Sequence, residues 1–473
     1  RADGLAAAMT AQLPFDLTAG QRDVLDVISA ELAGAHPMNR MLQGEVGSGK
    51  TVVALLAMLQ MIDAGYQCAL LAPTEVLAAQ HAQSIRAMLG PLAMAGQLGG
   101  TDQATAVTLL TGSMSAQQKR DARREVAGGT SGIVIGTHAL LQDAVEFENL
   151  GMVVVDEQHR FGVEQRDRLR AKAREGITPH LLVMTATPIP RTVALTVYGD
   201  LETSTLRELP RGRQPITTTA IFVREKPTWL SRAWQRVVEE VGAGRQAYVV
   251  ASRIDENDKP AKGGGHDAGQ GGPPPVTVVQ MFERLSNGPL AGLRLGLMHG
   301  RLAAEDKDAV MSAFRAGDID VLVCTTVIEV GVDVPNATVM VVMDADRFGI
   351  SQLHQLRGRI GRGQHPSLCL LATNLPETSK AGQRLRAVAG TLDGFALADL
   401  DLLERSEGDV LGLHQSGRAI TLRFLSLALH REVIETAKQL CERVFEHDPQ
   451  DPGMAILSAP FVDADRVQYL DMS

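Results

Sequence analysis

The hydrophobic residues of the chain gather in short runs that alternate with longer stretches of mixed polar and apolar residues. Gly, Pro and Thr bound these runs, and the stretches between them are long enough for crossover helices. This alternation is typical of a parallel sheet that helices cover on both faces. A first series of predicted strands comprises CALLAP (68–73), VTLLTG (107–112), GIVIGT (132–137), GMVVVDE (151–157) and HLLVMTAT (180–187).

The strand pattern begins again in a second part of the chain. Its predicted strands are QAYVVAS (246–252), LRLGLMHG (293–300), IDVLVCTT (319–326), ATVMVVMDA (337–345) and SLCLLAT (367–373). The segment RELPRGRQPI (207–216) separates the two series and is rich in Pro, Gly and Arg, which indicates an inter-domain linker. We therefore predict two α/β lobes, at about residues 15–207 and 214–375.

Two segments lack the strand pattern. DKPAKGGGHDAGQGGPPP (258–275) is rich in Gly and Pro without periodicity, so we predict a surface loop inside the second lobe. After the last strand, RFLSLALHREVIETAKQLCERVF (423–445) has helical periodicity, which indicates a small, mainly helical region. The predicted domains are therefore 1–207, 208–375 and 376–473.

Composition places the chain among soluble proteins with sizeable aliphatic cores. Of its 473 residues, 45% are hydrophobic and 21% charged, whereas only 4% are aromatic. The net charge of −9 argues, taken alone, against a general polyanion binder, although a basic groove can coexist with an acidic exterior. No run reaches the length of a membrane span, and the start shows no signal-peptide pattern.

The four cysteines, Cys68, Cys324, Cys369 and Cys441, do not lie at metal-ligand spacing. The first three fall in apolar runs, where a small buried core residue is expected. Without a disulfide framework, the cysteines indicate a reducing compartment such as the cytoplasm.

The segment GEVGSGKT (44–51) matches the phosphate-loop pattern GxxxxGK[ST] through Gly44, Gly49, Lys50 and Thr51. It lies between the short apolar stretch MLQ and a helix-compatible apolar run. The glycines let the backbone wrap around phosphate oxygens, Lys50 adds a positive charge at the β/γ phosphates, and Thr51 offers a hydroxyl to Mg²⁺. The alternative is a chance Gly-rich turn.

A pair of carboxylates supports the phosphate-loop reading. VVVDEQH (153–159) places Asp156 and Glu157 at the end of a predicted buried strand. In phosphate-loop enzymes an acid at this place holds Mg²⁺, which suits Asp156, and Glu157 suits the base that polarises the attacking water. An isolated acidic pair would otherwise be a solvated strand end. Together with the loop, the pair predicts ATP, or less readily GTP, with Mg²⁺.

Arginines in the second lobe fit the same chemistry. QLHQLRGRIGRG (352–363) contains Arg359 and Arg362, three apart, which we expect on one helical face. Charge that develops on a transferring phosphoryl group needs Arg from outside the phosphate loop. The alternative is a solvated basic helix.

These segments, in this order, resemble the superfamily-two helicases and translocases, and among them most closely the RecG family of branched-DNA helicases. The resemblance implies two tandem RecA-like P-loop lobes with parallel sheets, followed by a small mainly helical C-terminal region. The matching segments are PFDLTAGQ (14–21), GEVGSGKT, APTEVLAAQH (72–81), TGS (111–113), GTHALLQ (136–142), DEQHRFGVEQR (156–166), TATPIPRT (185–192), HGRL (299–302), TTVIEVGVDVPNA (325–337) and QLRGRIGRG (355–363).

The resemblance also implies roles for individual residues. Gln21 resembles the adenine reader, and the nucleotide contacts it implies further include Gly47, Ser48, Gly331, Asp333 and Gln355. APTEVLAAQH, TGS and GTHALLQ resemble the motifs of the first lobe that contact a DNA strand. Candidates for DNA backbone contacts, or neighbours of them, are Thr137, His138, His299 and Thr326.

The region 391–417 resembles the helical-hairpin translocation motif of the family, with Arg405 and 415–417 fitting the pattern. The chain departs from it at RSEG (405–408), where the family usually has an RGPG-like turn. Only residues 1–13 precede PFDLTAGQ, so we expect the motor lobes and C-terminal region without the N-terminal wedge domain.

The function implied is an ATP-dependent DNA helicase or translocase that acts on branched DNA, such as stalled forks and Holliday junctions, in recombination and repair. ATP and Mg²⁺ are the expected cofactors and branched or duplex DNA the expected partner, with a monomer in the cytoplasm and no membrane. Two alternatives are the motor of a transcription–repair coupling translocase and a nucleotide-gated clamp on junctions.

Overall fold

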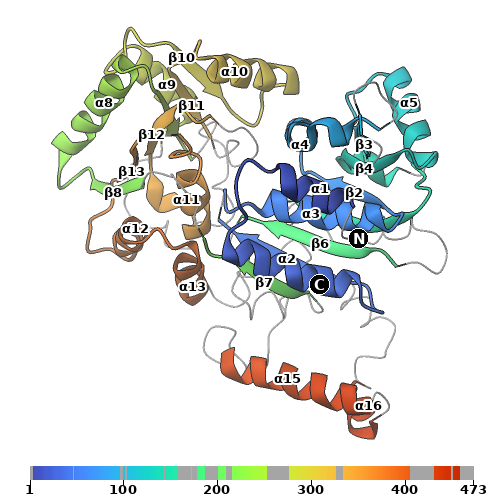
Figure 1. Cartoon of the computed structure of the whole chain (residues 1–473). Coiled ribbons are helices and arrows are strands. Elements are labelled where there is room, and N and C mark those ends of the chain that lie inside the picture. The colour runs from blue at the N-terminus through green and yellow to red at the C-terminus, as the bar shows by residue number, and fades with distance from the viewer. Residues whose placement is uncertain are drawn as a thin grey trace. The chain divides into compact units, whose positions relative to one another are not determined.

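The computed structural model describes residues 4–45, 47–95, 100–101, 104–142, 144–156, 172, 178–186, 201–208, 216–252, 276–325, 334–363, 365–404, 431–448 and 451–458. The chain divides into two compact units, one formed by Arg1–Glu208 with Ser406–Ser473 and the other by Leu209–Arg405. Figure 1 shows the helices and strands of the two units. Within the described ranges, no helix is long and apolar enough to cross a membrane.

The first unit is built around a parallel sheet whose seven described strands have the order β3-β4-β2-β5-β6-β1-β7. The strands are β1 (Asn39–Gly44), β2 (Gln67–Leu71), β3 (Ala106–Leu110), β4 (Ser131–Gly136), β5 (Leu150–Asp156), β6 (His180–Thr185) and β7 (Glu202–Leu206). The helices are α1 (Leu5–Gln12), α2 (Ala19–Leu32), α3 (Lys50–Asp63), α4 (Glu75–Leu89) and α5 (Ala116–Ala127), with the short 3-10 turns η1 (Gly90–Ala93) and η2 (His138–Leu141).

Both faces of this sheet are buried, which explains why its central strands are apolar along their whole length. In β5, Met152 and Val154 join the core under α1 to α4, whereas Val153 and Val155 join the core under α5 and η2. Helix α3 is itself apolar on nearly all sides, because it packs between the sheet and the helices α1 and α2.

The second unit repeats this architecture around a parallel sheet of six described strands in the order β10-β11-β9-β12-β13-β8. The strands are β8 (Ile216–Phe222), β9 (Gln246–Val250), β10 (Leu295–Met298), β11 (Val321–Cys324), β12 (Ala337–Val342) and β13 (Ser367–Thr373). The helices are α8 (Pro227–Gly242), α9 (Val278–Ser286), α10 (Ala304–Ala316), α11 (Ile350–Arg357), α12 (Lys380–Gly390) and α13 (Gly394–Glu404), with the 3-10 turn η5 (Ala345–Arg347).

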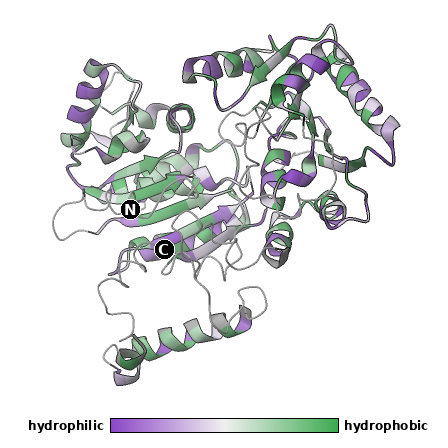
Figure 2. Ribbon diagram, turned by 180° about the vertical axis from the view of Figure 1, so that it is seen from behind, coloured by the Kyte–Doolittle hydropathy of each residue, from purple (hydrophilic) through white to green (hydrophobic). Residues whose placement is uncertain are grey.

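The core of the second unit also has two layers. Tyr248 of β9 lies in the layer that α10, α11, α12 and α13 cover, and its neighbour Val249 lies in the layer covered by α8 and α9. Tyr248 meets Phe314 edge-to-face with ring centroids 5.0 Å apart. Figure 2 shows the hydrophobic residues concentrated on the strands of both sheets.

The C-terminal part of the chain contributes helices α15 (Arg431–His447) and α16 (Pro452–Ser458). Cys441 lies on α15 and is exposed, whereas Cys68, Cys324 and Cys369 are buried, as predicted. Burial raises the pKa of the Cys68 and Cys324 thiols, and raises that of Cys369 to about 12 against a smaller opposing effect of Arg357.

The prediction of two α/β lobes with parallel sheets, and a helical region after them, is confirmed, and each of the ten predicted strands coincides with an observed one. Strands β1, β7 and β8 were not predicted. The helix predicted at 423–445 is present as α15 from Arg431. The linker core at 209–215 and the Gly/Pro-rich loop at 258–275 lie outside the described residues.

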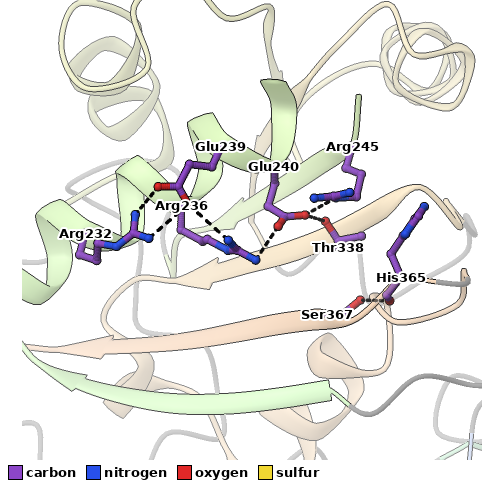
Figure 3. A network of polar contacts seen from close by, with 8 residues as sticks. All are labelled: Arg232, Arg236, Glu239, Glu240, Arg245, Thr338, His365 and Ser367. Carbon is purple, nitrogen blue, oxygen red and sulfur yellow. Dashed lines mark hydrogen bonds and ion pairs between the residues drawn. The ribbon is translucent and has the colours of Figure 1, made fainter. Parts of the chain in front are cut away.

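A network of charged side chains ties α8 to strand β12 and to the turn before β9 (Figure 3). Glu240, only 3% exposed, pairs with Arg236 (2.7 Å) and Arg245 and accepts a hydrogen bond from Thr338 (2.8 Å). Burial raises the pKa of the Glu240 carboxyl, but the hydrogen bonds from Arg245 and Thr338 and the nearby positive charges outweigh burial, so the net pKa lies below the ordinary 4.5.

Glu240→Ala is expected to lower the free energy of unfolding of the second unit by about 3 kcal/mol, because the Arg245 guanidinium and the buried Thr338 hydroxyl lose their acceptor. The matched control is Glu239→Ala, which breaks exposed pairs with Arg232 (2.6 Å) and Arg236 (3.3 Å) and should leave the free energy of unfolding nearly unchanged. Urea unfolding followed by tryptophan fluorescence measures both, because the two tryptophans of the chain lie in α8.

The same contribution should depend on pH. Because the folded pKa of Glu240 is lowered, its stabilisation is fully present above pH 4.5 and is lost as the pH falls through the lowered value. Equal effects of the Glu239 and Glu240 substitutions would contradict the assignment of a buried network.

Candidate nucleotide-binding site

The phosphate loop connects β1 to α3 through two glycines in the left-handed region. Gly47 has φ 86° and Gly49, the N-cap of α3, has φ 87°, a conformation that side chains rarely adopt. A Cβ on Gly49 would also lie 2.2 Å from Nε2 of Gln21. The loop therefore needs glycine at position 49 for both its conformation and its packing.

Lys50 is the first residue of α3, and its ammonium lies within the loop. Its Nζ donates to the carbonyl oxygens of Gly44 (2.6 Å) and Glu45 (3.0 Å). The first turn of α3 carries no acidic residue, so the positive end of the helix dipole and the Lys50 charge act together. This combination suits a phosphate group.

Gln21 connects α2 to the loop. Its Oε1 accepts from the backbone N–H of Thr18 (2.9 Å), and its Nε2 donates to the carbonyl oxygen of Ser48 (2.9 Å). The residue predicted to read the base thus holds the loop backbone through both ends of its amide. Its contact with a nucleotide stays a prediction.

Asp156 lies at the same edge of the sheet as the loop. It ends β5, and both Asp156 and Leu42 of β1 pair with Met184 of the intervening strand β6. Since neighbouring strands are about 4.8 Å apart, the ends of β5 and β1 are on the order of 10 Å apart. A ligand bound outside the carboxyl ends of these strands can therefore reach both.

The oxygen donors at this edge fit a magnesium ion. Mg²⁺ prefers oxygen ligands and is held by one or two protein groups together with phosphate oxygens. Asp156 supplies a carboxylate at the end of β5, and Thr51 supplies a hydroxyl in the first turn of α3. In addition, the hydroxyl of Ser48 is buried without a hydrogen-bond partner among the described residues, as expected of a group that awaits an acceptor.

A contact that the sequence did not predict joins Asp156 to helix α4. Nε2 of His81 lies 2.7 Å from Oδ2 of Asp156, and because a carboxylate can only accept, His81 is the donor. His81 belongs to APTEVLAAQH, a segment that resembles a DNA strand-contact motif, and no pattern in the sequence indicates that Asp156 is its neighbour in space.

The arginines of the second unit do not share a helical face, so that prediction is wrong. Helix α11, which carries Gln355, ends at Arg357, and Gly361 has φ 71°. Arg359 and Arg362 therefore lie in the turn after the helix, where Nε of Arg362 donates to the Gly358 carbonyl (3.1 Å).

Arg357, in the same motif, has a structural role. It is only 2% exposed, and its guanidinium donates to the carbonyl oxygens of Val388 (2.9 Å) and Thr391 (2.7 Å). These bonds connect the end of α11 to the end of α12. Of the three arginines in this motif, Arg357 is buried and links two helices, whereas Arg359 and Arg362 are half-exposed.

Of the candidates for DNA contact, Thr137 is buried at the N-terminus of η2 and His299 is half-buried after β10. The side chain of His138 is not among those that the structure describes. Several other predicted residues also lie outside the described ranges, namely Glu157, Gly331, Asp333, Thr326, Arg405 and 415–417.

Residues 18–196 match the DEAD/DEAH box helicase family, 276–364 the helicase conserved C-terminal domain, and 391–460 the C-terminal part of domain 3 of the ATP-dependent DNA helicase RecG. These matches agree with the two RecA-like lobes and with the helical region that follows them.

Individual relatives are also named ATP-dependent DNA helicase RecG. The chain is 71% identical over 473 residues to the ATP-dependent DNA helicase RecG of Mycobacterium tuberculosis, covering 100% of this chain and 63% of that protein. It is 45% identical over 437 residues to that of Synechocystis, covering 92% and 49%. A solved structure of RecG bound to a three-way DNA junction matches with a TM-score of 0.69 and 37% identity, over 91% of this chain and 52% of the other.

Proposed function

Because the chain belongs to the RecG family of ATP-dependent DNA helicases, we propose that it is an ATP-driven DNA motor that acts on branched DNA in recombination and repair. The observation that carries the proposal is the meeting of the phosphate loop and Asp156 at one edge of the first sheet. The chain spans 63% of the length of its M. tuberculosis relative. The activity named for that whole protein is therefore proposed for this chain.

In this proposal the first unit binds ATP. The N–H groups around Gly44, Gly47, Ser48 and Gly49 and the ammonium of Lys50 hold the phosphates, and Gln21 holds the loop against α2. Thr51 and Asp156 would hold Mg²⁺, which neutralises charge on the phosphates when it is bound. Gly331, Asp333 and Gln355 are the further nucleotide contacts we propose.

Hydrolysis needs a base and a source of positive charge. Glu157 follows Asp156 directly and would orient and polarise the attacking water. Arg359 and Arg362 would stabilise the charge that develops on the transferring phosphoryl group. Each cycle would then advance the chain along duplex DNA through contacts to the phosphate backbone, which carry little sequence information.

The substrate we propose is branched DNA such as a stalled fork or a Holliday junction. The solved RecG relative was bound to a three-way junction, and that observation supports a branched substrate for this chain. Residues Thr137, His138, His299 and Thr326 are the proposed backbone contacts or their neighbours. We also propose that the protein acts as a monomer in the cytoplasm, without a membrane partner.

The test compares ATP hydrolysis by the chain alone, with a forked duplex and with a linear duplex of the same length and sequence. A larger stimulation by the fork, together with displacement of a triplex-forming strand, is the expected result. Equal stimulation by both duplexes would overturn the preference for branches. Nucleotide-dependent binding to junctions without displacement would replace the motor with a junction clamp.

A further inference from the structure

We propose that His81 is a positioning residue for the metal-binding carboxylate of Asp156, an inference that rests on the proposed ATPase function. The hydrogen bond from Nε2 of His81 engages Oδ2 of Asp156 at 2.7 Å. It fixes the rotation of the carboxylate about its Cβ–Cγ bond. Asp156 would then present its other oxygen, Oδ1, to a bound Mg²⁺.

The fold holds His81 firmly in place. Helix α4 begins at Glu75, with the Thr74 hydroxyl accepting from the N–H of Leu77 (3.3 Å). The core-facing positions of α4, Ala78, Ala82, Ile85 and Leu89, are 2% exposed or less, and His81 lies beside this stripe. The packed helix therefore fixes the backbone position from which the His81 ring reaches the carboxylate.

Burial makes the contact stronger than an ordinary surface hydrogen bond. The side chains of His81 and Asp156 are only 13% and 16% exposed, so water competes weakly for either group. Groups that orient a metal-binding side chain from behind change metal affinity by about 10- to 100-fold when they are removed. The neutral imidazole with its proton on Nε2 is sufficient for this role, because it already supplies the donor.

Helix α4 also connects Asp156 to the segment TGS (111–113), which the sequence assigned to DNA contact. Oε1 of Glu75, six residues before His81 on the same helix, accepts a hydrogen bond from the N–H of Ser113 (3.1 Å). The same helix therefore contacts both the Asp156 carboxylate and TGS.

The experiment compares His81→Phe with His81→Gln in the full chain. Phe keeps a ring and removes the donor, whereas Gln places an amide N–H at about the reach of Nε2. Gln83→Ala, an exposed position on the same helix, is the matched control. Binding of a fluorescent ATP analogue is measured in EDTA and over a range of MgCl₂ concentrations, and the Mg²⁺ concentration for half-maximal ATP hydrolysis is measured alongside.

His81→Phe is expected to raise the half-maximal Mg²⁺ concentration about tenfold in both measurements, while analogue binding in EDTA stays at the wild-type value. His81→Gln and Gln83→Ala should retain the wild-type Mg²⁺ requirement. If His81→Phe lowers the melting temperature or kcat without moving the Mg²⁺ requirement, His81 is only a structural residue and the inference is overturned. If the wild-type chain shows no Mg²⁺-dependent binding or hydrolysis of ATP, the proposed function itself fails.

Discussion

Arg362→Ala is expected to lower kcat for ATP hydrolysis by about 10³- to 10⁵-fold while nucleotide affinity stays nearly unchanged. An arginine that meets charge only as it develops on the phosphoryl group stabilises the transition state and not the bound ground state. Steady-state hydrolysis gives kcat, and binding of a fluorescent ATP analogue gives the affinity of the same variant.

Two further variants test whether the effect depends on the guanidinium group of Arg362 and not on positive charge alone. Arg362→Lys keeps the charge but loses the planar fork of donors, so most of the activity should still be lost. Arg386→Ala removes a charge from a largely exposed side chain that pairs with Glu377 in the same unit, and should leave kcat unchanged. A kcat of Arg362→Ala close to wild type would remove this residue from the chemistry.

Lys50→Ala is expected to reduce kcat/KM by about 10²- to 10³-fold, with weaker ATP binding as well as slower turnover. Its ammonium lies in the phosphate loop, within 3.0 Å of two loop carbonyls, so it would meet the phosphates in both the ground state and the transition state. The loss of affinity distinguishes this variant from Arg362→Ala. Equilibrium binding and initial rates, measured on the same preparation, test the difference.

The control for Lys50→Ala is Lys380→Ala, which removes an exposed ammonium at the start of α12. It should bind and hydrolyse ATP like the wild type. Circular dichroism of Lys50→Ala checks that the loop substitution leaves the helices intact. Unchanged ATP affinity in a folded Lys50→Ala chain would contradict the assignment of the phosphate loop.

Central strands that the sequence predicted, such as β2, β4 and β5, are buried on both faces. Strand β5 reads LGMVVVD because helices cover both sides of it, and such a run is visible without any structure. Strands β7 (ETSTL) and β8 (ITTTAIF) lie at the edges of their sheets, where threonine and serine replace aliphatic residues. In β7 these hydroxyls are partners for polar groups of β1, since Ser204 accepts from Arg40 (2.8 Å) and Thr205 from Gln43 (3.0 Å).

In the candidate site, too, features of one contiguous segment could be predicted from the sequence, whereas contacts between distant segments could not. The phosphate loop is a contiguous segment, so its pattern predicts its conformation, and Gly47 and Gly49 have the left-handed φ that the pattern requires. The pairing of His81 with Asp156 joins residues 75 positions apart and depends on how α4 packs on the sheet. The turn at Arg359 and Arg362 could not be predicted from spacing alone, because Gly358 ends the helix between Arg357 and Arg359.

The distribution of the thiols has a practical consequence for single-molecule work. Three of the four cysteines lie inside the two cores, and burial keeps them as unreactive thiols, whereas Cys441 on α15 is open to solvent. A maleimide dye added to the folded chain thus has one attachment point, in the C-terminal region. The chain can carry a single fluorophore without any cysteine being replaced.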